Sequence, residues 1–168
     1  KMYREEKITK SELRYQRLKS VFDTIGYPVS DQLINILSDE YINNLSTFNN
    51  LFPNAIEVLD YLQPNYKLHI ITNGFQEIQD KKLRNSGIHS YFNHIIDSEM
   101  AGVKKPNPII FNLALNRANA KPQTSLMIGD SLDAKAVGLH TIHFNAHKEE
   151  IHDEAPIIYN LQEIKSFL

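Results

Sequence analysis

Three short segments of the sequence carry residue types that could bind an anion and a metal ion. Thr72-Asn73-Gly74 offers a hydroxyl, a carboxamide and a glycine turn, where backbone N–H groups could converge on a phosphate or a carboxylate. Lys105 could bring an ammonium group that neutralises such an anion. Asp130 could supply a carboxylate to Mg²⁺, which binds one or two carboxylates together with water and substrate oxygens.

Each segment also has a structural explanation that remains open when the segment is considered alone. Thr72-Asn73-Gly74 could be a turn that caps a helix, and Asp130 or Ser131 could cap the helix that follows. Lys105 could be a solvated surface residue, and its neighbour Lys104 could take the same role in a site. The segments therefore indicate chemistry only if the fold brings them together.

The elements predicted after the first fifty residues would position the three segments at one edge of a sheet. Short apolar runs predict strands at 67–72, 94–96, 126–128 and 141–144, and 157–159 could form a fifth. Helical patterns lie between these runs, so we predict an α/β fold with a parallel sheet covered on both faces. Ligands bind beyond the carboxyl ends of the strands in such sheets, where all three segments would lie.

The first fifty residues are predicted to be helical. Thr9 and Glu12 fit a capping box at the start of one helix, Gly26 could end it, and Ser30 could cap a second helix. Apolar residues recur at helical spacing in both segments: Leu18, Val21, Phe22 and Ile25 in the first, and Leu33, Leu37, Tyr41 and Leu45 in the second. We therefore predict a helical domain over 1–50 and a sheet-containing core over 51–168.

Composition excludes several classes of protein. The chain has 168 residues, 42% of them hydrophobic, with a formal net charge of −2 and no cysteine. These values argue against a disordered chain, a nucleic-acid-binding protein, a disulfide scaffold and cysteine chemistry, and they are compatible with a reducing cytoplasm. No apolar run approaches the roughly 20 residues that span a bilayer. His140, His143 and His147 have a metal-like spacing, but residues 140 and 143 would face opposite sides of a strand, which disfavours zinc.

Taken together and in order, the three strand ends resemble the haloacid dehalogenase (HAD) superfamily, over essentially the whole chain. The segments 70–75, 98–107 and 144–147 are similar in amino-acid sequence to the branch of pyrimidine 5'-nucleotidases that act on noncanonical nucleotides. The resemblance implies a HAD-like Rossmannoid core of three layers with a parallel sheet at 51–168, and a helical cap of the C1 type at 1–50.

The resemblance also implies an activity: magnesium-dependent hydrolysis of small phosphomonoesters, of the nucleoside 5'-monophosphate class, through an aspartyl-phosphate in the cytoplasm. Thr72 and Lys105 would be catalytic, Asn73 and Gly74 would join them in binding the phosphate, and Asp130 would bind Mg²⁺. The partner would be a small molecule, with neither a nucleic acid polymer nor a membrane involved. The alternatives are an inactive phosphate-binding relative, a phosphoglucomutase-like enzyme or a 2-haloacid dehalogenase, the last disfavoured by an aspartate at position 130.

The sequence departs from the family pattern in two places. No two aspartates lie one residue apart, so the Asp-x-Asp-x-Thr nucleophile motif is absent. Because the chain begins at Lys1, inside the implied cap, we expect that motif and its strand to precede residue 1, and a sheet without this strand would have two open edges. Ten residues separate Asp130 from Thr141, which is short for a crossover, so we also expect residues to be missing between Ala134 and Lys135. Asp133 is then only a weak candidate for a second acidic ligand.

Overall fold

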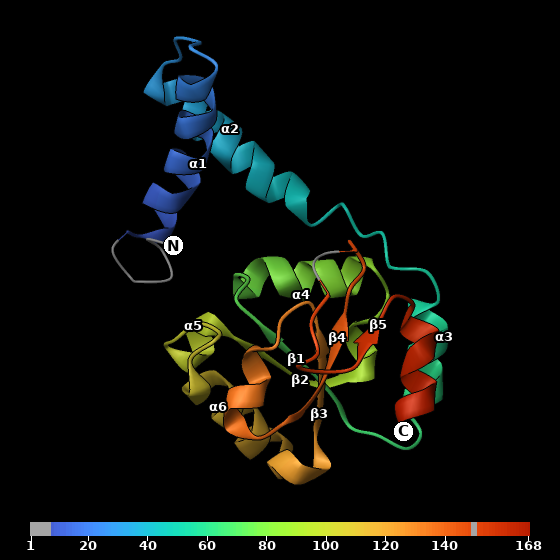
Figure 1. The fold of residues 1–168 in the computed structure, drawn as a ribbon. Helices are drawn as coiled ribbons and strands as arrows, with labels where there is room; N and C mark the ends of the chain where they lie inside the picture. Colours follow the sequence, from blue (N-terminus) through green and yellow to red (C-terminus); the bar gives the residue numbers. More distant parts are fainter. Residues whose placement is uncertain (1–7, 149–150) are drawn as a thin grey trace. The chain divides into compact units, whose positions relative to one another are not determined.

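The computed structural model describes residues 8–148 and 151–168, which form two compact units divided between Phe48 and Asn49 (Figure 1). The first unit is a helical hairpin, and the second contains all the described strands. Among the described residues, no helix has the length and apolar character needed to cross a lipid bilayer.

The hairpin consists of α1 (Lys10–Thr24) and α2 (Asp31–Leu45). The predicted capping box at the start of α1 is confirmed, because Glu12 N donates to Thr9 Oγ1 at 3.2 Å and Thr9 N donates to Glu12 Oε2 at 2.7 Å. Ser30 caps α2 as predicted. These local hydrogen bonds satisfy backbone N–H groups that the first turn of a helix leaves without a partner.

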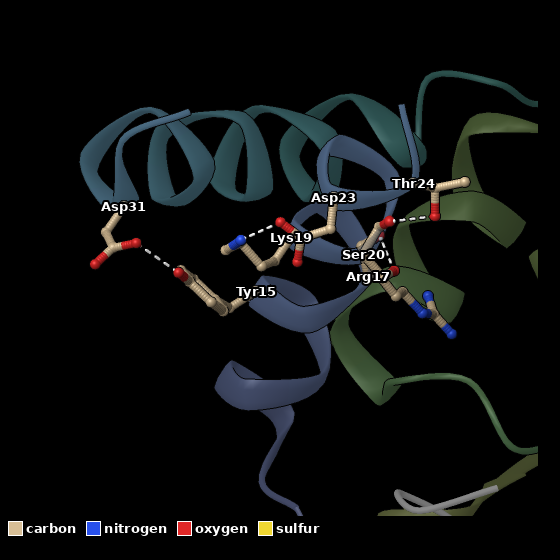
Figure 2. A network of polar contacts seen from close by, with 7 residues as sticks. All are labelled: Tyr15, Arg17, Lys19, Ser20, Asp23, Thr24 and Asp31. Atoms are coloured by element: carbon tan, nitrogen blue, oxygen red, sulfur yellow. Dashed lines mark hydrogen bonds and ion pairs between the residues drawn. The ribbon is translucent and has the colours of Figure 1, made fainter. Parts of the chain in front are cut away.

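A hydrogen bond joins the two helices of the hairpin, and other polar contacts lie within α1 (Figure 2). The Tyr15 hydroxyl donates to Asp31 Oδ1 at 2.6 Å and so connects α1 to the first turn of α2. Lys19 and Asp23 form an ion pair one turn apart, and the Thr24 hydroxyl donates to the carbonyl oxygen of residue 20 at 2.7 Å. All of these groups are at least partly exposed, so each pair contributes modestly to stability.

The apolar stripes predicted for the hairpin are only partly buried. Ile34, which is next to the predicted α2 stripe, is completely buried, whereas Leu33 and Tyr41 within the stripe remain 42% and 52% exposed. In α1, Val21 and Ile25 are likewise exposed. The helical periodicity is therefore correct, but the face that becomes buried is rotated from the predicted one.

The second unit alternates helices and strands, as predicted. Its elements follow the order α3 (Ala55–Leu62), β1 (Leu68–Thr72), α4 (Gln76–Asn85), η1 (His89–Tyr91), β2 (Phe92–Asp97), α5 (Ser98–Ala101), α6 (Pro108–Ala118), η2 (Pro122–Thr124), β3 (Leu126–Gly129), η3 (Asp133–Val137), β4 (His140–Phe144), β5 (Ile157–Ile158) and η4 (Leu161–Phe167). The elements labelled η are 3₁₀ helices. The α/β class predicted from the sequence is thus confirmed.

All strand pairs are parallel, as predicted, but the strands form two sheets. β1 pairs with β2, and Thr72 lies opposite Asp97 at the carboxyl end of the pair. β3 pairs with β4, and β4 with β5, in the second sheet. Within residues 8–148 and 151–168, no strand pairing joins β1 to β3. Among the described residues, β1 and β3 each therefore pair with a strand on one side only.

Two clusters of buried side chains lie on opposite faces of the strands. One cluster packs α6 against β2 and η3, with Ile96, Ile110 and Phe111 at its centre. The other packs α3 and η4, which lie side by side in Figure 1, against β4 and β5. Helices, strands and helices thus form three layers, and the first cluster joins the two sheets because it contains Ile96 of β2 and packs against Met127 of β3.

The crossover from β3 to β4 is η3, which includes Ala134 and Lys135. Lys135 N donates to Leu132 O at 3.0 Å, so one hydrogen-bonded turn spans the position where we expected missing residues. The expectation that residues are missing there stays a prediction. A 3₁₀ helix rises about 2.0 Å per residue, against 1.5 Å for an α-helix, which lets a short segment cover the return.

Candidate active site

The loop after β1 places the Thr72 hydroxyl at the carboxyl end of the first sheet. Thr72 Oγ1 accepts a hydrogen bond from Gly74 N at 2.9 Å, which folds the loop back on its own side chain. The Gly74 N–H, expected to help bind phosphate, is therefore used within the loop. Because Thr72 Oγ1 accepts this hydrogen bond, the Thr72 hydroxyl proton can be donated to another group.

The side chain of Gln79, from α4, lies close to Gly74. A Cβ atom at position 74 would lie 2.1 Å from Gln79 Nε2 and 2.8 Å from Gln79 Cγ. The Gln79 side chain thus packs directly over the glycine, and any larger residue there would displace it. The glycine keeps the loop compact against the first turns of α4.

Asn73 and Lys105, two residues expected to bind phosphate, are brought together by the fold. Asn73 Nδ2 donates to Lys105 O at 3.0 Å, and Lys105 N donates to Asn73 Oδ1 at 2.7 Å. Lys105 itself lies in a turn closed by a hydrogen bond from Asn107 N to Lys104 O at 2.9 Å. Asn107 then caps α6 by accepting from Ile109 N at 3.0 Å. The helix α6 therefore holds the turn that carries the lysine.

The end of β2 provides a second connection to the β1 loop. Glu99 Oε2 accepts from Gln76 N, the first residue of α4, at 3.1 Å. Asp97 is only 1% exposed, and its Oδ1 accepts from Glu99 N at 2.8 Å and from Met100 N at 2.9 Å. Sequence reasoning missed this role, although an aspartate just before Ser-Glu at a strand end is a typical helix N-cap.

Asp130 directly follows β3 and is exposed to solvent. The loop turns where Asp133 N donates to Ser131 Oγ at 3.3 Å, and η3 begins there. An open depression beside this loop is lined by Pro106, Leu132, Asp133, Lys135 and Glu154. Since Pro106 follows Lys105 and Leu132 lies two residues after Asp130, this depression adjoins both the lysine segment and the aspartate segment.

The donor set at the end of β3 is suited to magnesium rather than to a metal enclosed by protein ligands. Within the described residues, no group of three or more His, Cys, Asp or Glu side chains gathers to hold a metal ion. Mg²⁺ needs no such group, because it retains water and binds through one or two carboxylates and substrate phosphate. The exposed carboxylate of Asp130 fits this requirement.

The histidines near the end of β4 have partners other than a shared metal. His143 Nδ1 lies 2.7 Å from His152 Nε2, and the two rings stack with centroids 4.8 Å apart. The ring of His140 forms a hydrogen bond to Gln123 O at 3.2 Å, and His147 is exposed. The structure therefore does not gather the three histidines whose spacing suggested zinc.

A second histidine pair, also missed from the sequence, lies across β1 and β2. His69 and His94 are partners in the parallel register, and their rings stack with centroids 5.2 Å apart and an angle of 12° between the planes. Both ring nitrogens of His69 are buried without a hydrogen-bond partner among the described residues. Burial lowers the pKa of His69, and the nearby His94 and Lys67 lower it further.

Comparison with known proteins gives consistent matches to one family. A family model described as haloacid dehalogenase-like hydrolase matches residues 4–140. The chain is 32% identical over 154 residues to pyrimidine 5'-nucleotidase YjjG of Escherichia coli, covering 88% of this chain and 66% of that protein. It is 30% identical over 170 residues to pyrimidine 5'-nucleotidase PynA of Streptococcus pneumoniae, covering 97% and 70%. The chain thus spans about two thirds of the length of these relatives.

The fold is also found in a solved structure of a similar protein. The crystal structure of the HAD-hydrolase YfnB from Bacillus subtilis, described as bound to magnesium, superposes with a TM-score of 0.82 at 30% sequence identity. The superposition covers 99% of this chain and 76% of that one. Glyceraldehyde 3-phosphate phosphatase of Methanothermobacter thermautotrophicus is 33% identical over 131 residues, covering 70% of this chain and 58% of that protein.

Proposed function

Because this chain belongs to the haloacid dehalogenase-like hydrolases, we propose that the protein containing it is a magnesium-dependent phosphatase of small phosphomonoesters. The observation that carries the proposal is the pair of hydrogen bonds between Asn73 and Lys105, which joins the β1 loop to the lysine turn. A hydroxyl, backbone N–H groups and an ammonium group are the donors that a phosphate ester requires.

In this mechanism the described residues act by positioning and by neutralising charge, which is most of what phosphoryl transfer requires. The Thr72 hydroxyl donates a hydrogen bond to a phosphoryl oxygen. Gly74 N donates a hydrogen bond to Thr72 Oγ1 and so orients the hydroxyl. The Lys105 ammonium offsets the charge that accumulates on the phosphoryl oxygens. When bound by Asp130, Mg²⁺ would supply further positive charge opposite the phosphate.

The attacking carboxylate is assigned to sequence beyond this chain. The chain contains no pair of aspartates one residue apart. We therefore propose that the nucleophile precedes residue 1 and that residues 1–50 belong to a helical cap that governs substrate access. Without that nucleophile the same donors would bind phosphate without hydrolysing it, so a phosphate-binding protein is the second candidate.

Nucleoside 5'-monophosphates are the substrates we propose to test first. This choice is supported by the names of two relatives, both pyrimidine 5'-nucleotidases, each at least 30% identical to this chain. Glyceraldehyde 3-phosphate is the natural competitor, because other relatives of similar identity carry that phosphatase name. Both compounds present the same phosphomonoester group and differ in the leaving group. The residues that contact the leaving group would therefore decide between them.

The test is hydrolysis by the full-length protein that contains this chain. Phosphate release would be measured from nucleoside 5'-monophosphates, glyceraldehyde 3-phosphate and sugar phosphates, with Mg²⁺ and with a chelator. Lys105→Ala should lower kcat by about 10²–10³-fold, the effect of removing one donor that stabilises transition-state charge. Lys104→Ala is the matched control and should have little effect.

Three outcomes would contradict the proposal. Activity that survives chelation would refute the magnesium dependence, and equal losses in Lys104→Ala and Lys105→Ala would refute the assignment of the lysine. Tight binding of inorganic phosphate with no hydrolysis of any ester would favour the phosphate-binding protein.

A further inference from the structure

The carboxamide of Asn73 bonds to a backbone that is distant in sequence. Its donor and its acceptor both bind the same residue, Lys105, at 3.0 and 2.7 Å, across 32 positions of chain. Two opposite residues in an antiparallel sheet exchange the same pair of hydrogen bonds. Here the carboxamide of Asn73 takes the place of one of these residues. The contact uses one N–H donor and one oxygen lone pair of the carboxamide, which is half of its hydrogen-bonding capacity.

The two segments joined by this contact are each fixed independently. On one side, Thr72 is the last residue of β1 and pairs in register with Asp97 of β2. On the other side, the turn at Lys105 leads directly into α6, whose Phe111 is completely buried. The Asn73 carboxamide therefore sets the distance between a strand end and a helix start that are both anchored in the core.

Lys105 needs such an anchor more than the other residues of the site. A lysine side chain has four rotatable carbon–carbon bonds and a strongly hydrated point charge, so it does not fix its own position. Only its backbone can be held, and the Asn73 carboxamide holds the N–H and the C=O of that single residue. Displacement of a charge by about 1 Å can lower a rate by about 10²-fold.

We propose that Asn73 is a positioning residue whose carboxamide holds the Lys105 backbone, keeping the ammonium group near Thr72, and that it does not bind the phosphate through its side chain. The inference rests on the proposed phosphatase function, since it states how one catalytic group of that site is held. It assigns the Asn73 side chain a task that is separate from phosphate binding.

The first test is a double-mutant cycle on the full-length enzyme, with Asn73→Ala, Lys105→Ala and the double variant. If Asn73 acts through Lys105, Asn73→Ala should lower kcat about tenfold or more with a small change in KM, and the double variant should be no slower than Lys105→Ala. Asn112→Ala, at an exposed position of α6, is the matched control and should leave kcat unchanged.

The second test measures the contact without using activity. Hydrogen exchange at the Lys105 amide should be slow in the wild type, because this N–H donates to Asn73 Oδ1, and it should become much faster in Asn73→Ala. Asn73→Asp keeps the acceptor and the volume but loses the donor to Lys105 O. It should therefore retain part of the protection while still lowering kcat, which keeps the test usable if the alanine variant folds poorly.

The outcomes separate the inference from the proposed function. Additive losses in the cycle would show that Asn73 acts on the substrate directly and would overturn the inference, as would unchanged exchange at Lys105 in both Asn73 variants. Hydrolysis that does not depend on Lys105 would instead overturn the proposed function, whatever the exchange rates are.

Discussion

The carboxyl ends of the two sheets are constructed in different ways. At the end of β1 and β2, side chains bond to distant backbone: Asn73 to Lys105, and Glu99 to Gln76. At the end of β3, Asp130 is exposed, and the hydrogen bond that shapes its loop is local, from Asp133 N to Ser131 Oγ. The end of β1 and β2, which we call the braced end, is held by these contacts between distant segments. The end of β3 is a short surface loop.

The difference corresponds to what each end is proposed to hold. An ammonium group must be placed by the protein, because a lysine side chain is flexible and its charge acts only at close range. A hydrated Mg²⁺ brings its own water ligands and binds substrate oxygens, so it requires one accessible carboxylate more than a rigid enclosure. The comparison therefore predicts that the two ends respond differently to substitution.

Asp130→Asn gives the largest expected effect. The variant keeps the size of the side chain but removes the charge, so the Mg²⁺ concentration for half-maximal activity should rise by at least about tenfold, since even the loss of a residue behind a metal ligand costs 10–100-fold in metal affinity. The measurement is phosphate release by the full-length protein against Mg²⁺ concentration.

Asp133→Asn, three residues along the same loop, is the matched control for Asp130→Asn. A small effect there and a large effect at Asp130 would support the assignment. A larger effect at Asp133 would transfer the metal ligand to that residue, and no effect at either position would show that the β3 end does not hold the metal.

The same comparison explains which features could be predicted from the sequence. The capping box of Thr9 and Glu12, the strand that ends at Thr72 and the cap at Ser30 depend on neighbours a few residues away, and all three are present. The parallel α/β arrangement follows from the alternation of elements, and it is present too. Such features are determined by local hydrogen bonding and by hydrophobic periodicity.

Features that depend on pairing between distant segments could not be predicted in this way. The sequence singles out Asn73 and Lys105, but the contact between them requires the end of β1 to meet the turn before α6. Stacking of His69 on His94 depends on the strand register, which shifts between Leu68 and His69. Only the folded backbone brings these groups within hydrogen-bonding or stacking distance.

Asp97→Ala tests the braced end, with an intermediate expected effect. Asp97 and Asp130 both follow apolar strands, but Asp97 is buried and accepts from two backbone N–H groups. Loss of this cap should lower the free energy of unfolding by about 1 kcal/mol, within the usual range of 0.5–2 kcal/mol for a helix N-cap. Urea unfolding followed by circular dichroism gives the measurement.

Asp97→Ser is the matching rescue, because serine is also a good N-cap and should restore most of the stability. Asp130→Ala should leave the unfolding curve nearly unchanged, since that side chain is exposed. If both alanine variants were equally destabilised, the contrast between a braced end and an open loop would fail.

The smallest effect is expected from the pH dependence of His69, which lies on the same sheet as the braced end. Burial lowers the pKa of His69 in the folded protein, and His94 and Lys67 add to the shift. The folded state therefore favours the neutral ring. As the pH falls through the unfolded pKa of about 6.5, the unfolded chain binds a proton at this position before the folded chain does. Stability that is present above about pH 6.5 is lost as the pH falls towards the lowered pKa.

His69→Gln should reduce this loss, because the variant has no ring to protonate. Urea midpoints measured between pH 8 and pH 5 should fall less steeply for the variant than for the wild type, while the difference between them should be constant above about pH 7.5, where the ring is neutral in both states. Parallel curves over the whole range would mean that His69 has the same pKa in the folded and the unfolded state. Since His69 is paired with His94 across β1 and β2, a steeper wild-type curve would also locate acid sensitivity in the sheet that carries Thr72.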